Sequence, residues 1–147
     1  MNGELVGRTR HTQLSLDQLA ELQPGLGQLM PQISERYWIL YYAARGGNWA
    51  LAHYQLRGIR TLMRVGETTR PKMADRLKAF QEGHLGAVEK AIEARDWNAF
   101  EKAYTEGIEA ANRNHATTGH PEIVWKLSPT PPEHLGLTPL EGEASNR

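Results

Sequence analysis

The 147-residue chain contains no cysteine. Without thiols it cannot form disulfides, thiolate zinc sites, iron–sulfur clusters or thioether-attached haem, and it has no cysteine nucleophile. It also has no excess charge, because 17 Lys and Arg residues balance 17 Asp and Glu residues. Binding to nucleic acids in general, or to anionic membranes, depends on surplus positive charge. The composition therefore argues against both kinds of partner.

Long apolar runs are missing as well. No window approaches the 18 apolar residues that a membrane-spanning helix needs. Residues 1–10 contain no apolar stretch typical of a secretory signal peptide. Taken at face value, these absences predict a cytoplasmic protein without a membrane partner. The length corresponds to one domain that can bury a core without disulfides or a structural metal.

Helical patterns fill most of the chain. Ser15 and Gln18 form a capping box that predicts a short helix ending before Pro24. Four longer patterns follow, separated by glycine pairs and prolines, and Asn48 and Asp96 are the predicted caps of the second and the fourth. Pro31 is expected to kink the first of them or to reset its start. The four predicted long helices cover residues 25–45, 48–66, 71–94 and 96–117.

Helices of about 20 residues joined by very short turns must lie antiparallel to their neighbours. The sequence thus predicts an all-α fold, an up-down-up-down four-helix bundle over residues 15–120. A flexible arm is expected at 1–14. An extended Pro-rich tail is expected at 121–147, because proline excludes a long helix there.

Polar residues interrupt the apolar stripes of the predicted helices at two levels. Rise per residue places Tyr37, His84 and Tyr104 at similar heights in the bundle, where all three should be mostly buried. The second level, near the opposite end, contains His115, which should also be mostly buried. Its expected neighbours are one arginine and three methionines: Arg64, Met30, Met63 and Met73.

Two interpretations compete for these polar residues. Most buried tyrosines and histidines have a structural role only: they form a hydrogen bond with a neighbouring group. Alternatively, His84 or His115 binds a metal or haem iron, or acts as a general base. Neither histidine lies in a metal-binding motif, and His115 is the better metal candidate. Gly83 and Gly86 weaken the helix around His84 and favour a local kink there.

Three further side chains stand beside the stripes. Arg60 flanks the core of the second long helix and could hold a carboxylate. Trp38 and Tyr42, four residues apart, point away from the core of the first long helix. Exposed aromatics at this spacing predict a partner surface, and a homodimer contact is the simplest form of it.

Three stretches of sequence carry a family resemblance. They are Arg36-Tyr37 followed by Ala43-Ala44 and Gly47-Asn48-Trp49, then Ala87–Ala94, and finally Ala111–His120 with Ser128–Pro132. About two-thirds of the chain resembles the four-helix domain of class II c-type cytochromes. In that family a Cys-x-x-Cys-His motif ends the fourth helix.

The resemblance implies a former haem site that has lost its covalent attachment. Ala111 and Asn114 stand where the family has its two cysteines, and His115 occupies the position of the proximal haem ligand. Covalent haem is thus excluded, whereas non-covalent haem is not. Either large side chains fill the former haem space, with Trp125 as the candidate plug, or a pocket persists near His115. The persistent pocket is favoured, because Ala111 and Asn114 are too small to refill the space.

Four functions remain open at this stage. The favoured one is a small-molecule-binding protein that uses the internal cavity, with the methionines, His115, Arg60 and Arg64 as binding residues. A non-covalent, b-type haem protein with His115 as axial ligand comes next. A cofactor-free enzyme would use His84 or His115 as acid or base, with Tyr37 and Tyr104 as hydrogen-bond donors. An interaction module would use Trp38 and Tyr42.

Overall fold

The computed structural model describes residues 5–140, so the predicted arm at 1–4 and the predicted tail at 141–147 lie outside it. The structure is mainly helical, as predicted, and it also contains two short strands. In chain order the elements are β1 (Val6–Arg8), β2 (Gln13–Ser15), α1 (Leu16–Glu21), α2 (Leu26–Arg45), α3 (Trp49–Thr69), the 3-10 helix η1 (Pro71–Met73), α4 (Ala74–Phe80), the π-helix η2 (Gln81–Leu85), α5 (Gly86–Ala94) and α6 (Trp97–Thr117).

The helix starts follow the capping signals in the sequence. Ser15 and Gln18 form the predicted capping box at α1. Asn48 accepts a hydrogen bond from the Leu51 backbone at the start of α3, and Asp96 accepts one from the Ala99 backbone at the start of α6. Side-chain oxygens at these positions satisfy backbone N–H groups that have no partner within the helix.

The sequence predicts irregularities at two places in the long helices, Pro31 and the region of Gly83 and Gly86. Pro31 neither ends nor restarts α2, which runs unbroken from Leu26 to Arg45. The expected irregularity near Gly83 is present, because Gln81–Leu85 forms the π-helix η2 between α4 and α5. A π-turn inserts one residue into the helical repeat and so rotates the residues around it.

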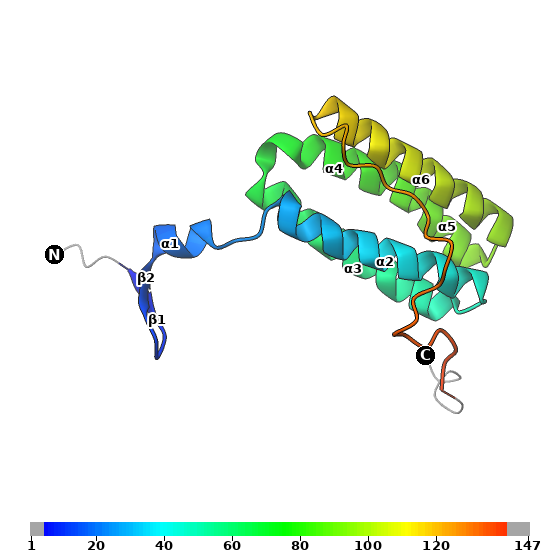
Figure 1. Ribbon diagram of the computed structural model, residues 1–147, viewed down its shortest axis with the longest axis horizontal. Coiled ribbons are helices and arrows are strands. Elements are labelled where there is room, and N and C mark those ends of the chain that lie inside the picture. The colour runs from blue at the N-terminus through cyan, green and yellow to red at the C-terminus, as the bar shows by residue number, and fades with distance from the viewer. Residues whose placement is uncertain (1–4, 141–147) are drawn as a thin grey trace.

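The long helices lie side by side in a helical body, which we define as residues 24–117 (Figure 1). α2 packs against α3, and α6 packs against α5 and η2. α3 also contacts α4 and α5, so the two pairs of helices enclose one apolar core. Its fully buried side chains come from every long helical stretch and include Ile33, Leu40, Leu56, Ile59, Leu85, Val88 and Phe100.

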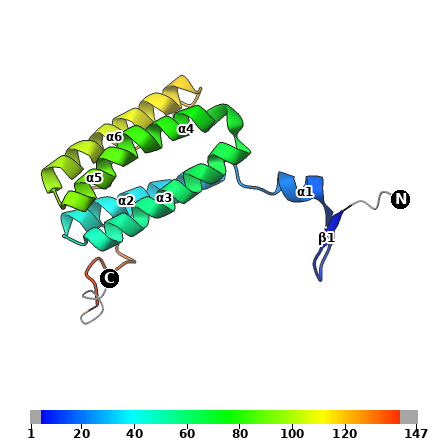
Figure 2. The same ribbon diagram turned by 180° about the vertical axis from the view of Figure 1, so that it is seen from behind.

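The N-terminal residues form an ordered hairpin, so the predicted flexible arm is corrected for residues 5–14. β1 and β2 pair antiparallel, with Gly7 opposite Leu14. Together with α1 they stand away from the helical body, as both ribbon views show (Figures 1 and 2). Three-residue strands are too short to show the alternation of apolar and polar residues by which strands are found in a sequence.

Residues 121–140 contain no helix or strand and run along α2 and α6. The Trp38 indole N–H donates to the Thr130 carbonyl (2.8 Å), and the Tyr42 hydroxyl donates to the Ser128 carbonyl (2.7 Å). The expectation that Trp38 and Tyr42 are exposed is therefore wrong. Tyr42 is buried and Trp38 half-buried, because a segment without helical periodicity covers this face of α2.

Within residues 5–140, no helix is long and apolar enough to cross a membrane.

Candidate functional site

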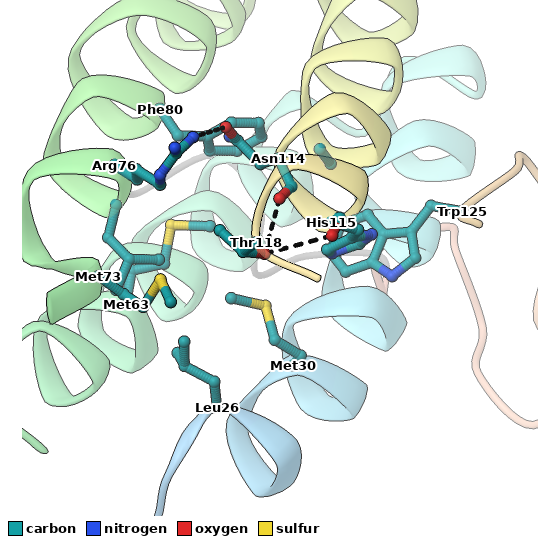
Figure 3. Close-up of a pocket in the computed structure, with 12 residues that line it drawn as sticks. Leu26, Met30, Met63, Met73, Arg76, Phe80, Asn114, His115, Thr118 and Trp125 are labelled. Atoms are coloured by element: carbon teal, nitrogen blue, oxygen red, sulfur yellow. Dashed lines mark hydrogen bonds between the residues drawn. The ribbon is translucent and has the colours of Figure 1, made fainter. Parts of the chain in front are cut away.

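An apolar cavity of about 90 Å³ lies in the helical body near the N-terminal end of α2. Met30 from α2, Met63 from α3 and Met73 from η1 point into it (Figure 3). Apart from Met1 these are all the methionines of the chain. We call this space the methionine cavity; its remaining apolar walls are Leu26, Leu77, Phe80, Ala111 and Trp125.

Local structure brings the three methionines together from distant parts of the sequence. Met63 lies in the buried stripe of α3, whereas Met30 and Met73 are half-buried at the rim. Pro71 begins the 3-10 turn that places Met73 beside the end of α3. The structure thus unites the three methionines and Ala111 with His115, as the sequence analysis expected.

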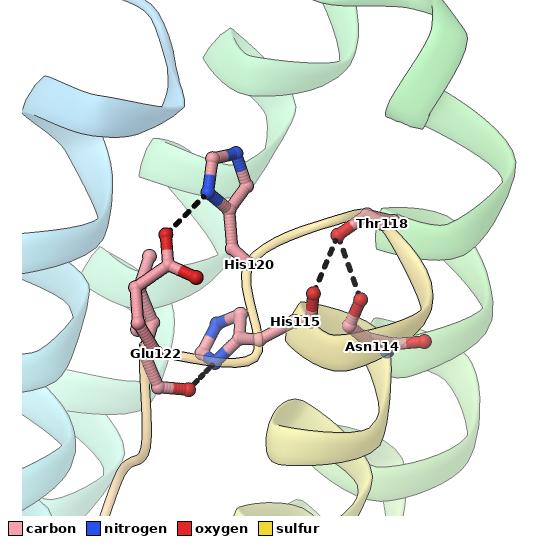
Figure 4. A network of polar contacts seen from close by, with 6 residues as sticks. Asn114, His115, Thr118, His120 and Glu122 are labelled. Carbon is pink, nitrogen blue, oxygen red and sulfur yellow. Dashed lines mark hydrogen bonds and ion pairs between the residues drawn. The ribbon is translucent and has the colours of Figure 1, made fainter.

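His115 stands where the cavity opens. Its Nδ1 lies 3.0 Å from the Ile123 carbonyl oxygen (Figure 4). A carbonyl oxygen only accepts hydrogen bonds, so Nδ1 carries the hydrogen. In the neutral imidazole, Nε2 then keeps a lone pair for a hydrogen-bond donor or a metal ion. His115 is mostly but not fully buried, in the last turn of α6.

Trp125 closes one side of the cavity. Asn112 fixes the Trp125 backbone on both sides: its Nδ2 donates to the Trp125 carbonyl (2.9 Å), and its Oδ1 accepts from the Trp125 N–H (2.6 Å). The Trp125 ring meets the His115 imidazole edge-on, with centroids 5.7 Å apart. Trp125 therefore forms a wall, and the pocket predicted beside it persists.

The polar rim holds residues that the sequence analysis missed. Arg76 lines the cavity, and its Nη1 donates to Asn114 Oδ1 at 3.3 Å. The Thr118 hydroxyl lies 2.7 Å from the Asn114 carbonyl oxygen and thereby closes the end of α6 (Figure 4). Neither Arg76 nor Thr118 interrupts an apolar stripe, so periodicity offered no signal for them.

A wider groove of about 580 Å³ adjoins the cavity on the outside. The two spaces share Met30, Met73, His115 and Trp125 among their walls. His120 lies at the edge of this groove, where its Nδ1 is 2.9 Å from a carboxylate oxygen of Glu122. This hydrogen bond lowers the pKa of the Glu122 carboxyl below its usual value.

Tyr37 and Tyr104 form a closed pair in the middle of the body. Each hydroxyl donates to the other residue's backbone carbonyl, at 2.8 and 2.9 Å. The rings stack with centroids 4.1 Å apart. Both residues are buried as expected, and burial raises the pKa of each phenol far above its ordinary value of 10. The hydroxyl hydrogens are thus engaged within the protein.

His84 does not join the tyrosine pair or the methionine cavity. It reaches the level of Tyr37, since both side chains approach Gly107 on α6. However, it lines a separate surface groove with Phe80 and Arg113. The side chain is mostly buried as expected, but it faces this groove and not the tyrosine pair.

The two predicted binding arginines lie elsewhere. Arg60 Nη2 pairs with Glu89 Oε2 at 2.6 Å, so the carboxylate that it holds belongs to this chain. Arg64 is exposed and does not line the methionine cavity. The prediction placed Arg64 by its position along the axis of α3 alone. Arg64 follows Met63 by one residue, so its side chain points about 100° away from that of Met63 around the helix axis.

Comparisons with known proteins identify no relative of this chain. The chain matches no family model, no curated protein and no solved structure. The resemblance to class II cytochromes remains a prediction. Among the described residues, no group of three or more His, Cys, Asp or Glu side chains could hold a metal ion.

Proposed function

We propose that this protein binds a small, mainly apolar molecule in the methionine cavity, within an up-down-up-down four-helix bundle. One observation carries the proposal: all three methionines beyond Met1 line a single cavity whose opening is marked by His115. Small-molecule sites are typically apolar spaces with a few placed polar groups. Thioether side chains are flexible and polarisable, which suits them to lining such a site.

The size and polarity of the cavity indicate the class of ligand. Protein interiors are close-packed, so a void of about 90 Å³ costs free energy unless something fills it. An aromatic molecule of one or two rings could occupy the cavity and extend into the groove. A ring N–H or O–H could donate to Nε2 of His115. Indole has both properties and is the probe of choice.

The test is a thermal and calorimetric titration of the protein with indole. Ligand at a hundred times its dissociation constant stabilises the folded state by about 2.7 kcal/mol. Ala111→Leu fills the cavity from α6 and should abolish the shift. Ala116→Leu adds the same side chain at an exposed position of α6 and should leave the shift intact. Absence of any shift in the wild-type protein would contradict the proposal.

Non-covalent haem is a second candidate, supported by one specific contact. Histidines that ligate a metal usually donate their other ring N–H to a carbonyl or carboxylate. His115 does so through Nδ1 to Ile123. Met30 and Met73 lie nearby as possible second ligands. Haemin titration tests this candidate: a Soret band that shifts on binding and is lost in His115→Ala supports it, and an unchanged haemin spectrum rejects it.

The other two functions receive less support. An acid–base enzyme would need free hydroxyls on Tyr37 and Tyr104, but both donate to backbone carbonyls. An interaction module would need Trp38 and Tyr42 free for a subunit contact. The C-terminal segment already covers these two side chains.

A further inference from the structure

The N-terminal arm, which we define as residues 5–22, has its own small fold. β1 and β2 pair with each other, and α1 packs on both strands. Leu19 of α1 lies against Gly7 of β1, where an added Cβ would be 3.1 Å from Leu19 Cδ1. The arm extends from one end of the helical body without lying along it (Figures 1 and 2).

Such an arm has too little core to be stable alone. A two-stranded hairpin needs a further strand or a packed partner in water. The arm instead exposes three leucines: Leu5 at 71%, Leu16 at 55% and Leu22 at 67% of their surface. These side chains leave the arm with apolar surface that a second molecule could cover.

The arm is directed away from the groove of its own chain. The Thr69 hydroxyl donates to the Pro24 carbonyl at 2.8 Å, which fixes the chain where it enters the body. Gly25 lies directly beneath the Arg70 guanidinium, and a Cβ there would collide with Arg70 Nη2. The short connection at 23–25 is thus held in one direction, so the arm does not fold back onto its own body.

The groove outside the methionine cavity has the shape and chemistry to receive an arm. It lies at the same end of the body, where α2 begins and α6 ends. Leu26, Met30, Ile123 and Trp125 give it apolar walls. Arg70 and two histidines line it, whereas no carboxylate is among the described residues of its lining. α1 carries the opposite charge in Asp17 and Glu21.

We propose that the arm of one copy docks in the groove of a second copy, reciprocally, in a two-fold dimer. Leu16 of α1 and Leu22, which follows α1, fill the apolar groove, and Asp17 and Glu21 approach Arg70 of the partner copy. Because arm and groove lie at the same end of each body, one two-fold axis beyond that end satisfies both contacts. Each arm then covers the opening of the other copy's methionine cavity.

Sedimentation velocity on the full chain tests the exchange. The wild-type protein should be a dimer at micromolar concentration. Leu16→Lys/Leu22→Lys in the arm should raise the dimer dissociation constant at least tenfold, as should Ile123→Lys in the groove. Val124→Lys is the matched control, since Val124 is exposed next to Ile123 but does not line this groove. Circular dichroism confirms that each variant keeps its helices.

A mixing experiment identifies the two surfaces that meet. The arm variant has an intact groove, and the groove variant has an intact arm. Mixing them should restore a dimer through one intact contact. A monomeric wild-type protein, a dimer that survives the arm substitutions, or variants that fail to associate on mixing would each overturn the proposal. A groove variant that remains a dimer would also overturn it and would indicate arm-to-arm pairing. None of these outcomes depends on ligand binding in the cavity.

Discussion

The two ends of the helical body are built from different side chains. The end near the Gly46–Gly47 turn holds an aromatic cluster, in which Phe100 stacks near Trp97 and Tyr104 with centroids 5.6 and 5.8 Å away. Trp49 meets Phe100 edge-on, and Tyr41 meets Trp97 in the same way. The opposite end holds the methionine cavity. The same core thus has closely packed aromatic rings at one end and a cavity at the other.

The difference follows from the shapes of the side chains. Flat, rigid rings interlock and leave little space between them, and stacked or edge-on pairs add attraction beyond burial. Thioether chains have three rotatable bonds and adapt to whatever fills the gap between them. The aromatic end therefore serves stability, whereas the methionine end retains room for a ligand. Three predictions test this division of roles.

The largest effect is expected where packing is tightest. Phe100→Ala removes a fully buried ring from the aromatic cluster and should lower the free energy of unfolding by about 3–5 kcal/mol. Met73→Ala shortens a half-buried side chain beside an existing cavity and should cost less than half as much. Urea denaturation of both variants measures the difference. Equal losses would show that the two ends are packed alike.

A second effect concerns the paired tyrosines, which join the aromatic end to the middle of the body. Burial raises the pKa of Tyr37 and Tyr104 above 10, so above that pH the unfolded chain loses protons that the folded protein keeps. The contribution of these two phenols to the free energy of unfolding is fully present below pH 10 and is lost as the pH rises above 10. Each phenol should reduce stability by up to about 1.4 kcal/mol per pH unit.

Urea unfolding between pH 9 and pH 11.5 measures this slope. Tyr37→Phe/Tyr104→Phe should make the alkaline loss of stability shallower. Tyr54→Phe is the control, because Tyr54 is 56% exposed and its removal should leave the slope unchanged. The same slope in all three proteins would mean that the pair is accessible to solvent in the folded state.

The smallest effect compares two alanines on the core side of their helices. Ala43→Leu adds atoms to a position with no exposed surface and should cost about 1–3 kcal/mol. Ala111→Leu adds the same atoms into the methionine cavity and should change the unfolding free energy by less than about 1 kcal/mol. A larger penalty at Ala111 than at Ala43 would mean that the cavity cannot accept added atoms.

Much of the helical architecture could be predicted because its signals are local. Capping at Ser15, Asn48 and Asp96 depends on contacts within four residues, and each occurs as predicted. The sequence also predicted that the three methionines lie near His115, because these residues belong to the apolar stripes and lie at similar positions along their helices. The prediction for Arg64 was wrong, because its height along the helix was used without its direction around the helix axis, and His84 lies at the predicted height but lines a separate groove.

The sequence by itself determined the capped helix starts, the apolar stripes and the absence of thiol chemistry, since these depend on neighbouring residues and composition. Only the tertiary structure decided which faces are covered. The C-terminal segment lies on Trp38 and Tyr42 through hydrogen bonds that span about 90 residues of sequence. The ion pair of Arg60 with Glu89 joins α3 to α5 in the same manner. Such contacts join residues far apart in the chain, and no local pattern encodes them.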